Sequence, residues 1–211
     1  MIEYHKISTV YERATDGSKK LIDGLYRDAT TEYLSRLEWI WTEKIDGTNI
    51  RVHWDGHKVE FAGRTDRAQI QAELVNKLGR YFGTAEAEEL FEQVFGEKDV
   101  IIFGEGYGRK IQAVGSRYKP DGVDFIVFDV MINGNFMPRA AVVEIASAFG
   151  VDAVPIIQIG TVDDAIDFVK LKPMSRFGDA PMEGLVGRPL HELKDRCGNR
   201  IILKIKVRDF E

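Results

Sequence analysis

The sequence predicts an α/β (α+β) fold in which strands are interleaved with helices. Two observations lead to this fold class. Runs rich in β-branched and aromatic residues, too short for helices, occur at 100–104, 124–132 and 154–159. Segments with a helical period and capping signals alternate with these runs along the chain. A chain that alternates strands and helices in this way is expected to bury its core between sheets and helices.

Turn residues and apolar patterns place the strands. Residues 49–62 indicate a β-hairpin, because apolar residues alternate with polar ones on both sides of the tight-turn pair Asp55-Gly56. Residues 124–132 are apolar on both faces. A strand of that kind belongs in the interior of a sheet, where both of its faces are covered.

Four segments combine a helical period with end signals. Thr84 can cap one of them, and Pro138 suits the first position of another. Thr161 and Asp164 are spaced for a capping box. The expected helices span residues 67–82, 84–95 and 138–149, and a fourth follows Thr161.

Composition bounds the class of protein. A chain of 211 residues can bury one full core, so we expect a single domain over residues 1–211 with no separate C-terminal domain. Cys197 is the lone cysteine, and no Cys/His spacing resembles a zinc site. Without an export signal or a membrane span, a cytoplasmic protein is expected, including one of a phage or bacterial host cytoplasm.

The charge is locally uneven. The formal net charge of −5 excludes a protein that coats nucleic acid by bulk attraction. Residues 188–208 nevertheless hold seven Lys or Arg residues against two acids. Apolar residues take every second position in residues 201–207, so Lys204 and Lys206 are expected to share one strand face. A solvated basic face explains such a cluster as readily as a phosphate site does.

Five short motifs follow one another along the chain. Lys44 lies in the segment Thr42-Glu43-Lys44-Ile45-Asp46-Gly47-Thr48-Asn49. Taken alone, a lysine followed by Asp-Gly fits a solvated turn as well as a nucleophile. The other four motifs are Phe103-Gly104-Glu105-Gly106, residues 124–130, Glu183-Gly184-Leu185-Val186 and Lys204-Ile205-Lys206. Five motifs in this order are far more specific than any one of them.

In this order and spacing the motifs resemble the covalent nucleotidyltransferases, which comprise ATP- and NAD-dependent polynucleotide ligases and RNA capping enzymes. Thr48-Asn49 is similar to the phage-type RNA ligases that seal nicked or structured RNA, whereas DNA ligases and capping enzymes typically have Arg at the position of Asn49. The run of residues 104–108, followed by Lys110-Ile111-Gln112, resembles the same group. The resemblance implies a nucleotidyltransferase (ATP-grasp-like ligase) domain with antiparallel sheets flanked by helices and the nucleotide in a central cleft.

The resemblance implies that Lys44 carries AMP taken from ATP and passes it to a polynucleotide 5′-phosphate, which is then sealed to a 3′-hydroxyl. An amine attacks phosphorus only when it is unprotonated, and a free lysine has a pKa of about 10.4. Positive charges around Lys44 would lower that pKa. Lys204 and Lys206 are the family's phosphate-contacting lysines, and a divalent cation would add to their effect.

Further roles come from the resemblance alone. Glu183 is expected to bind hydrated Mg²⁺ (or Mn²⁺). Glu105 is expected to accept a hydrogen bond from the ATP ribose, beside glycines that let a ligand approach the backbone closely. Phe128 corresponds to the aromatic residue that stacks on adenine. Taken alone, each could equally be a surface acid or a core residue.

The same resemblance extends the site. Arg64 is expected to contact the nucleotide or the nucleic-acid end, and Asn49 to orient the nucleophile or a metal-bound water. Glu43, beside the nucleophile, counts among the nucleotide-binding residues. Arg109, Lys110 and Arg117 are weaker candidates for contacts with nucleic-acid phosphates.

Other functions stay open on the sequence. The main rival is an ATP-dependent DNA nick ligase, followed by a GTP-using capping enzyme. A nucleotide-binding module without sealing activity, such as an adenylate sensor, is the rival outside the ligases. The expected partners are ATP and RNA ends or nicks, with no membrane, and the expected state is a monomer. The chain stops five residues after Lys206, so a minimal ligase and an excised catalytic domain both fit.

Overall fold

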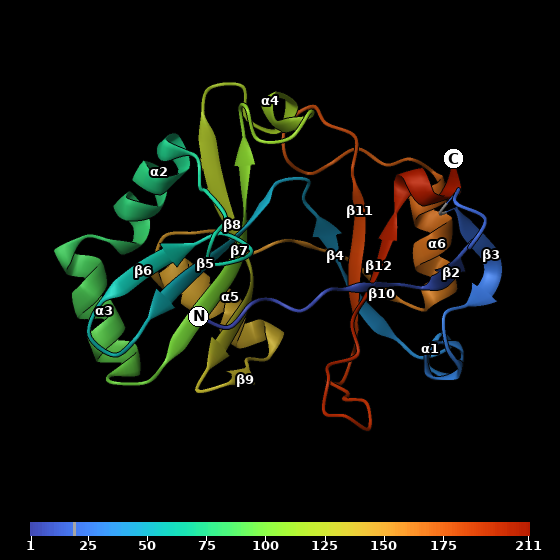
Figure 1. Cartoon of the computed structure of the whole chain (residues 1–211), viewed down its shortest axis with the longest axis horizontal. Coiled ribbons are helices and arrows are strands. Elements are labelled where there is room, and N and C mark those ends of the chain that lie inside the picture. Colours follow the sequence, from blue (N-terminus) through green and yellow to red (C-terminus); the bar gives the residue numbers. More distant parts are fainter. Residues whose placement is uncertain (19) are drawn as a thin grey trace. The chain divides into compact units, whose positions relative to one another are not determined.

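The computed structural model describes residues 1–18 and 20–211, which form two compact units (Figure 1). Unit 1 comprises Met1–Tyr4 and Asp46–Val154, and unit 2 comprises His5–Ile45 and Pro155–Glu211. Each unit has its own sheet and its own hydrophobic core. The single domain over residues 1–211 stays a prediction.

Unit 1 is built on a five-stranded antiparallel sheet in the order β6-β5-β7-β8-β9. The expected hairpin at 49–62 is confirmed as its first two strands. The run at 100–104 is only the beginning of a longer strand, because that strand has antiparallel partners on both sides. The strands are β5 (Thr48–Trp54), β6 (Val59–Ala62), β7 (Val100–Gly108), β8 (Val123–Ile132) and β9 (Asn135–Phe136).

The helices of unit 1 are α2 (Ala72–Phe82), α3 (Ala85–Phe95), α4 (Gly115–Tyr118) and α5 (Arg139–Ala148). The helix expected at 67–82 begins later, because Gln71 has an extended backbone with ψ 134°. Thr84 caps α3 as expected by accepting a hydrogen bond from the Ala87 N–H. Pro138 is the N-cap of α5 and does not take its first helical position.

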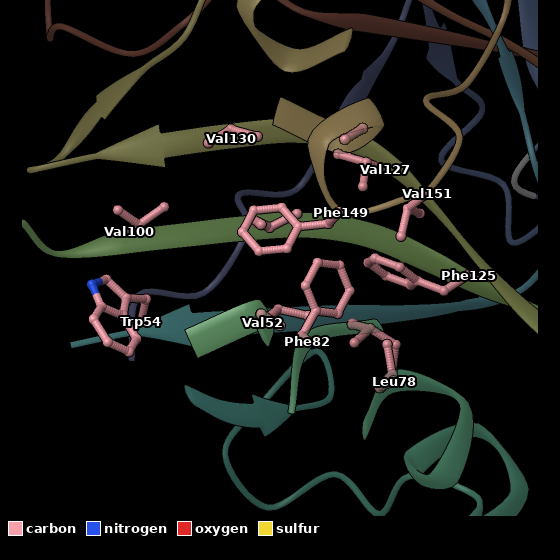
Figure 2. Close-up of a cluster of buried hydrophobic side chains, with 14 of the residues drawn as sticks. Val52, Trp54, Leu78, Phe82, Val100, Phe125, Val127, Val130, Phe149 and Val151 are labelled. Atoms are coloured by element: carbon pink, nitrogen blue, oxygen red, sulfur yellow. The ribbon is translucent and has the colours of Figure 1, made fainter. Parts of the chain in front are cut away.

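One face of this sheet packs against α2, α3 and α5. Figure 2 shows Trp54, Phe82, Phe125 and Phe149 in this cluster, together with valines of β5, β7 and β8. The aromatic rings lie close together, with 5.3 Å between the ring centres of Phe82 and Phe149. Burial of these large apolar side chains provides the main stabilisation of unit 1.

Unit 2 contains a five-stranded sheet in the order β1-β12-β11-β4-β10, antiparallel except for the parallel pair β1 and β12. The runs expected at 154–159 and 201–207 are confirmed as strands with shorter or shifted bounds. The strands are β1 (Ser8–Thr9), β4 (Trp39–Lys44), β10 (Ile156–Gly160), β11 (Gly184–Pro189) and β12 (Leu203–Lys206), and a separate pair is β2 (Tyr11–Arg13) with β3 (Leu21–Tyr26).

The helices of unit 2 are α1 (Ala29–Leu34), α6 (Val162–Lys170) and the 3₁₀ helix η1 (Val207–Phe210). The capping box expected at Thr161 and Asp164 is confirmed at the start of α6. Trp39 and Trp41 lie stacked in the core, with their ring centres 5.6 Å apart. In the part of the chain that the structure describes, none of the helices has both the length and the apolar character needed to span a membrane.

Candidate active site

Strand register in unit 2 brings Lys44 and the two lysines of β12 to one face of the sheet. Lys44 lies opposite Gly184 of β11, and Gly184 lies opposite Lys206 of β12. Lys204 lies two positions before Lys206 on β12. It pairs across the strands with Val186 of β11, which in turn pairs with Thr42 of β4. Residues two apart on a strand point to the same face, so the expectation of a shared lysine face is confirmed. The side chains of Trp39 and Trp41 fill the core on the other face.

The carboxylate of Glu183 bridges two of these lysines. Its Oε2 lies 2.6 Å from the Nζ of Lys44, and its Oε1 lies 2.6 Å from the Nζ of Lys206. The three side chains are only 14% to 23% exposed. Charge-assisted hydrogen bonds of this length are among the stronger polar contacts in proteins. Lys44 is therefore held inside a charged cluster and does not point into open solvent.

Lys204 shows the electrostatic effect of this crowding. Burial lowers its pKa from the ordinary lysine value to about 8, and the nearby charges of Lys206, Lys44, Arg13 and Lys6 act in the same direction. Lys6 and Arg13 come from the N-terminal segment, whose strand β1 pairs with β12. The lysine cluster thus has an excess of positive charge that a phosphate group would neutralise.

Glu43 lies on the opposite face of β4 from Lys44. Its side chain is only 2% exposed and accepts hydrogen bonds from the Ser175 hydroxyl and from the Arg176 N–H, the latter at 3.1 Å. Burial raises the pKa of Glu43, and these hydrogen bonds oppose that shift. Glu43 thereby ties β4 to residues 173–182, the segment that leads to Glu183. A contact between Glu43 and a nucleotide stays a prediction.

Two further candidates, Asn49 and Glu105, are cross-strand neighbours in unit 1. They face each other in the register between β5 and β7. The Oδ1 of Asn49 is buried and has no hydrogen-bond partner among the residues that the structure describes. A buried polar atom of this kind costs about 1–3 kcal/mol, which a hydrogen-bonding ligand or water can recover. Asn49 and Glu105 thus form a polar pair of neighbouring side chains on the sheet.

The glycines beside Glu105 are required by the internal packing of unit 1. A Cβ on Gly104 would lie 2.3 Å from the ring of Phe125, and a Cβ on Gly106 would lie 2.3 Å from a methyl group of Leu74. These glycines allow β7 to pack closely against β8 and α2. Their role in the fold is close internal packing, and the approach of a ligand to the backbone stays a prediction. Strand β7 continues past Glu105 to Gly108.

Phe128 lies at an irregularity of β8. In the register with β7, Gly104 pairs with Val127 and Phe103 pairs with Asp129, so Phe128 is an extra residue without an opposite partner. Such a β-bulge re-aims a side chain relative to the regular alternation. Phe128 is half-buried, as a ring that offers a surface to a ligand would be.

Arg64 is exposed in the turn after β6, and an arginine that the sequence did not single out supports that turn. Arg51 is fully buried and donates hydrogen bonds to the Gly63 carbonyl and to Asp66 Oδ1, each at 2.8 Å. It also donates to the Met1 carbonyl at 3.0 Å. Sequence alternation placed Arg51 on the polar side of its strand, and nothing local to it signals that this side is covered.

The remaining basic candidates are less closely tied to the site. Arg109 and Lys110 are exposed, and Arg109 lies 3.9 Å from Glu73. The neighbouring Gln112, known from the sequence only as part of a motif, donates a hydrogen bond to the Gly47 carbonyl at 3.0 Å. It therefore fixes the chain that follows Lys44 and Asp46.

The chain is similar to known proteins both in its sequence family and in its fold. The RNA ligase family matches residues 37–206. No curated protein sequence matches the chain. Among solved structures, a variant of Naegleria gruberi RNA ligase with ATP and manganese has a TM-score of 0.67 at 19% identity, over 97% of this chain and 56% of that one. A variant with AMP and manganese has a TM-score of 0.64 at 18% identity, over 95% and 60%.

An apo variant of the same ligase has a TM-score of 0.64 at 18% identity, over 85% of this chain and 52% of that one. The chain thus spans little more than half the length of these ligases, and at this identity the likeness shows a shared fold. The family match is broader evidence, because it runs from just before β4, which carries Lys44, to Lys206. From this match and the common fold it follows that the chain belongs to the RNA ligase family.

Proposed function

We propose that the protein is an ATP-dependent RNA ligase that forms a lysyl-AMP intermediate on Lys44. The observation that carries the proposal is the shared contact of Lys44 and Lys206 with Glu183, on a sheet face that also bears Lys204. Membership of the RNA ligase family supports it, and so do the ATP and AMP in the similar structures. The reaction adenylylates a 5′-phosphate end and joins it to a 3′-hydroxyl.

The first step makes a phosphoramidate. The neutral Nζ of Lys44 forms a bond to the α-phosphorus of ATP, the bond from that phosphorus to the bridging oxygen breaks, and pyrophosphate leaves with its electron pair. The proton lost from Nζ passes to solvent. Lys204 and Lys206 neutralise the phosphate oxygens, whose charge is the main obstacle to attack.

The next two steps return the lysine. An oxygen of the RNA 5′-phosphate attacks the AMP phosphorus, the bond to Lys44 Nζ breaks as this nitrogen takes a proton from solvent, and an RNA capped with AMP results. The RNA 3′-hydroxyl then attacks the 5′-phosphate, gives its proton to solvent and releases AMP. Each step transfers one phosphoryl group, so correct positioning of the reacting groups supplies much of the catalysis.

A divalent cation, Mg²⁺ or Mn²⁺, fits the chemistry of Glu183. The described residues contain no cluster of three or more His, Cys, Asp or Glu side chains able to hold a metal. Mg²⁺ commonly uses one or two carboxylates, with water and substrate phosphate as its other ligands. A cation bound to Glu183 would neutralise phosphate charge. Lys44 and Lys206 would then release the carboxylate, and Lys44 would become free to lose its proton.

The nucleoside contacts of this proposal rest on membership of the RNA ligase family. Glu105 accepts a hydrogen bond from the ribose, and Phe128 stacks on adenine. Asn49 has a buried oxygen that a hydrated cation or a ligand donor can satisfy. Arg64 contacts the nucleotide or the RNA end from its exposed turn. Glu43 contributes to nucleotide binding by holding β4, the strand that carries Lys44, against residues 173–182.

The test is a mass and sealing experiment on the purified protein. We expect incubation with ATP and Mg²⁺ to add the mass of one AMP to the peptide that contains Lys44, with no adduct from GTP or NAD. We expect sealing of an RNA nick to exceed sealing of a DNA nick of the same sequence. Faster DNA sealing would identify a DNA nick ligase, and an adduct without sealing of any end would identify a nucleotide-binding module.

The lowered pKa of Lys204 predicts how the affinity for nucleotide depends on pH. Phosphate binding favours the protonated amine, whereas the pKa of about 8 leaves roughly a tenth of Lys204 protonated at pH 9. We expect the affinity for α,β-methylene ATP, which cannot transfer AMP, to fall up to about tenfold between pH 7 and pH 9. Calorimetric titration measures it, and Lys204→Met should flatten the profile. An equally steep profile in that variant would contradict the assignment.

The same pKa has a consequence for stability with the opposite sign. The pKa of Lys204 is about 8 in the folded protein and has the ordinary value of about 10.4 in the unfolded chain. At a pH between these values the unfolded chain therefore binds more protons than the folded protein. The contribution of Lys204 to the free energy of unfolding therefore rises from about pH 8 towards pH 10.

A further inference from the structure

An aromatic side chain of the N-terminal segment packs on Phe128 within unit 1. The ring of Tyr4 lies edge-to-face with the ring of Phe128, with 4.9 Å between ring centres and 71° between planes. Tyr4 is only 8% exposed, so its ring is fixed by its surroundings. It also contacts Phe103 and Phe136, at 5.0 Å and 5.9 Å between ring centres. Phe128 thus borders an aromatic cluster with Tyr4 at its centre.

The hydroxyl group of Tyr4 contacts Asp129, the residue that follows Phe128 in the bulge. It donates a hydrogen bond of 2.8 Å to Oδ2 of Asp129, a side chain that is fully buried. Phe128 and Asp129 are adjacent at the point where β8 leaves its register with β7. Their neighbours Val127 and Val130 both belong to the core on the helix-covered face. Tyr4 therefore contacts both of the residues that lie between these two core positions.

The contacts of Tyr4 restrict a side chain that the bulge would otherwise leave less constrained. An extra residue in a strand lacks the cross-strand neighbours that would otherwise limit its side-chain conformations. Edge-to-face ring contacts restrict orientation, because the ring edge is attracted to the face of the other ring. A buried hydrogen bond from the same residue holds the side chain of Asp129, the next residue along the strand. Tyr4 supplies both constraints from one side chain.

We propose that Tyr4 is a positioning residue that sets the orientation of Phe128 for stacking on the nucleotide base. The inference rests on the proposed function, since it takes Phe128 as the adenine-stacking residue. Tyr4 itself needs no contact with ATP in this proposal, and its whole effect on the base passes through Phe128.

A double-mutant cycle tests the proposal in the full chain. The rate of AMP adduct formation is measured against ATP concentration for Tyr4→Leu, Phe128→Leu and the double variant. We expect Tyr4→Leu to raise the KM for ATP by about two- to tenfold, the range for an aromatic pair, with little change in kcat. The double variant should have the KM of Phe128→Leu alone, because Tyr4 no longer has a ring to position.

Two further variants separate positioning from general damage. Tyr4→Phe keeps the ring and loses the hydrogen bond to Asp129, so a KM between those of the wild type and Tyr4→Leu is expected. Phe136→Leu removes another ring that packs on Tyr4. It should lower the melting temperature and leave the KM for ATP nearly unchanged. If Tyr4→Leu fails to fold, Tyr4→Phe combined with Phe128→Leu completes the cycle.

Each outcome has one meaning. Multiplicative effects of Tyr4→Leu and Phe128→Leu on the KM would show that Tyr4 acts independently, and the proposal would fall. An unchanged KM in Phe128→Leu would overturn the adenine role of Phe128 and, with it, the role of Tyr4, while the lysine chemistry would stand. The absence of any AMP adduct on the wild-type protein would refute the proposed function itself.

Discussion

Replacing Lys44 with alanine is expected to abolish covalent AMP and all sealing that starts from ATP. No other amine can replace it in the proposal, since Lys204 and Lys206 serve the phosphates. The loss should exceed about 10³-fold, as is typical when a catalytic nucleophile is removed. The measurement is the retention of labelled AMP on the protein after denaturing electrophoresis.

The Lys44 variant also separates chemistry from folding. Lys44 shares its carboxylate partner with Lys206, so Glu183 keeps one ion pair when Lys44 is absent. We therefore expect the melting temperature to change little. Lys44→Arg is the matched control, because it restores the charge beside Glu183 without a competent nucleophile, and it should be equally inactive. A labelled adduct that persists in either variant would disprove the assignment.

Glu183→Gln is expected to slow adduct formation on Lys44 by about 10²-fold or more. The neutral amide binds a hydrated divalent cation poorly, so the phosphate charge that the cation would neutralise would remain during the attack. Lys44 and Lys206 would then lose their shared anion on a sheet face that also bears Lys204. After allowance for solvent screening, a loss of about 1–2 kcal/mol in unfolding free energy is expected.

A matched control exists in the same unit. Glu192 forms an ion pair with Arg200 in the segment between β11 and β12, away from the lysine cluster. Glu192→Gln removes a carboxylate from an ion pair in the same way and should leave the adduct rate unchanged. Adduct rates measured by rapid quench, with urea unfolding for stability, distinguish the two variants. Equal rates in Glu183→Gln and the wild type would rule out a catalytic role for Glu183.

Local patterns predicted several elements correctly. Asp55-Gly56 marked the hairpin turn, and Thr161 with Asp164 marked the start of α6. These signals depend on backbone groups a few residues away, so they are readable without tertiary contacts. The same holds for Lys204 and Lys206, whose common face follows from strand alternation.

Elements set by distant partners were not predicted. The strands of the N-terminal segment are short, and β1 exists because it pairs with β12 at the other end of the chain. Strand β7 runs past Glu105 because β5 and β8 supply hydrogen bonds on both sides. Pairing of this kind depends on residues far apart in the sequence, which no local pattern reports.

The candidate site shows the same division. Motif order alone was enough to select Lys44, Glu183 and the lysines of β12. The contact of Lys44 with Glu183 joins residues 139 positions apart and required the pairing of β4 with β11. The burial of Arg51 also depended on a segment distant in sequence, since the carbonyl of Met1 accepts one of its hydrogen bonds.

By itself the sequence determined which residue types could perform the chemistry and which strand faces they occupy, because both depend on covalent order and on the period of two along a strand. Only the tertiary structure decided which of them meet. It placed the carboxylate of Glu183 between two amines, brought the carboxylate of Glu43 to the Ser175 hydroxyl, and set Tyr4 against Phe128. The physical reason is that register and burial arise from long-range packing, whose partners are fixed only when the sheets form.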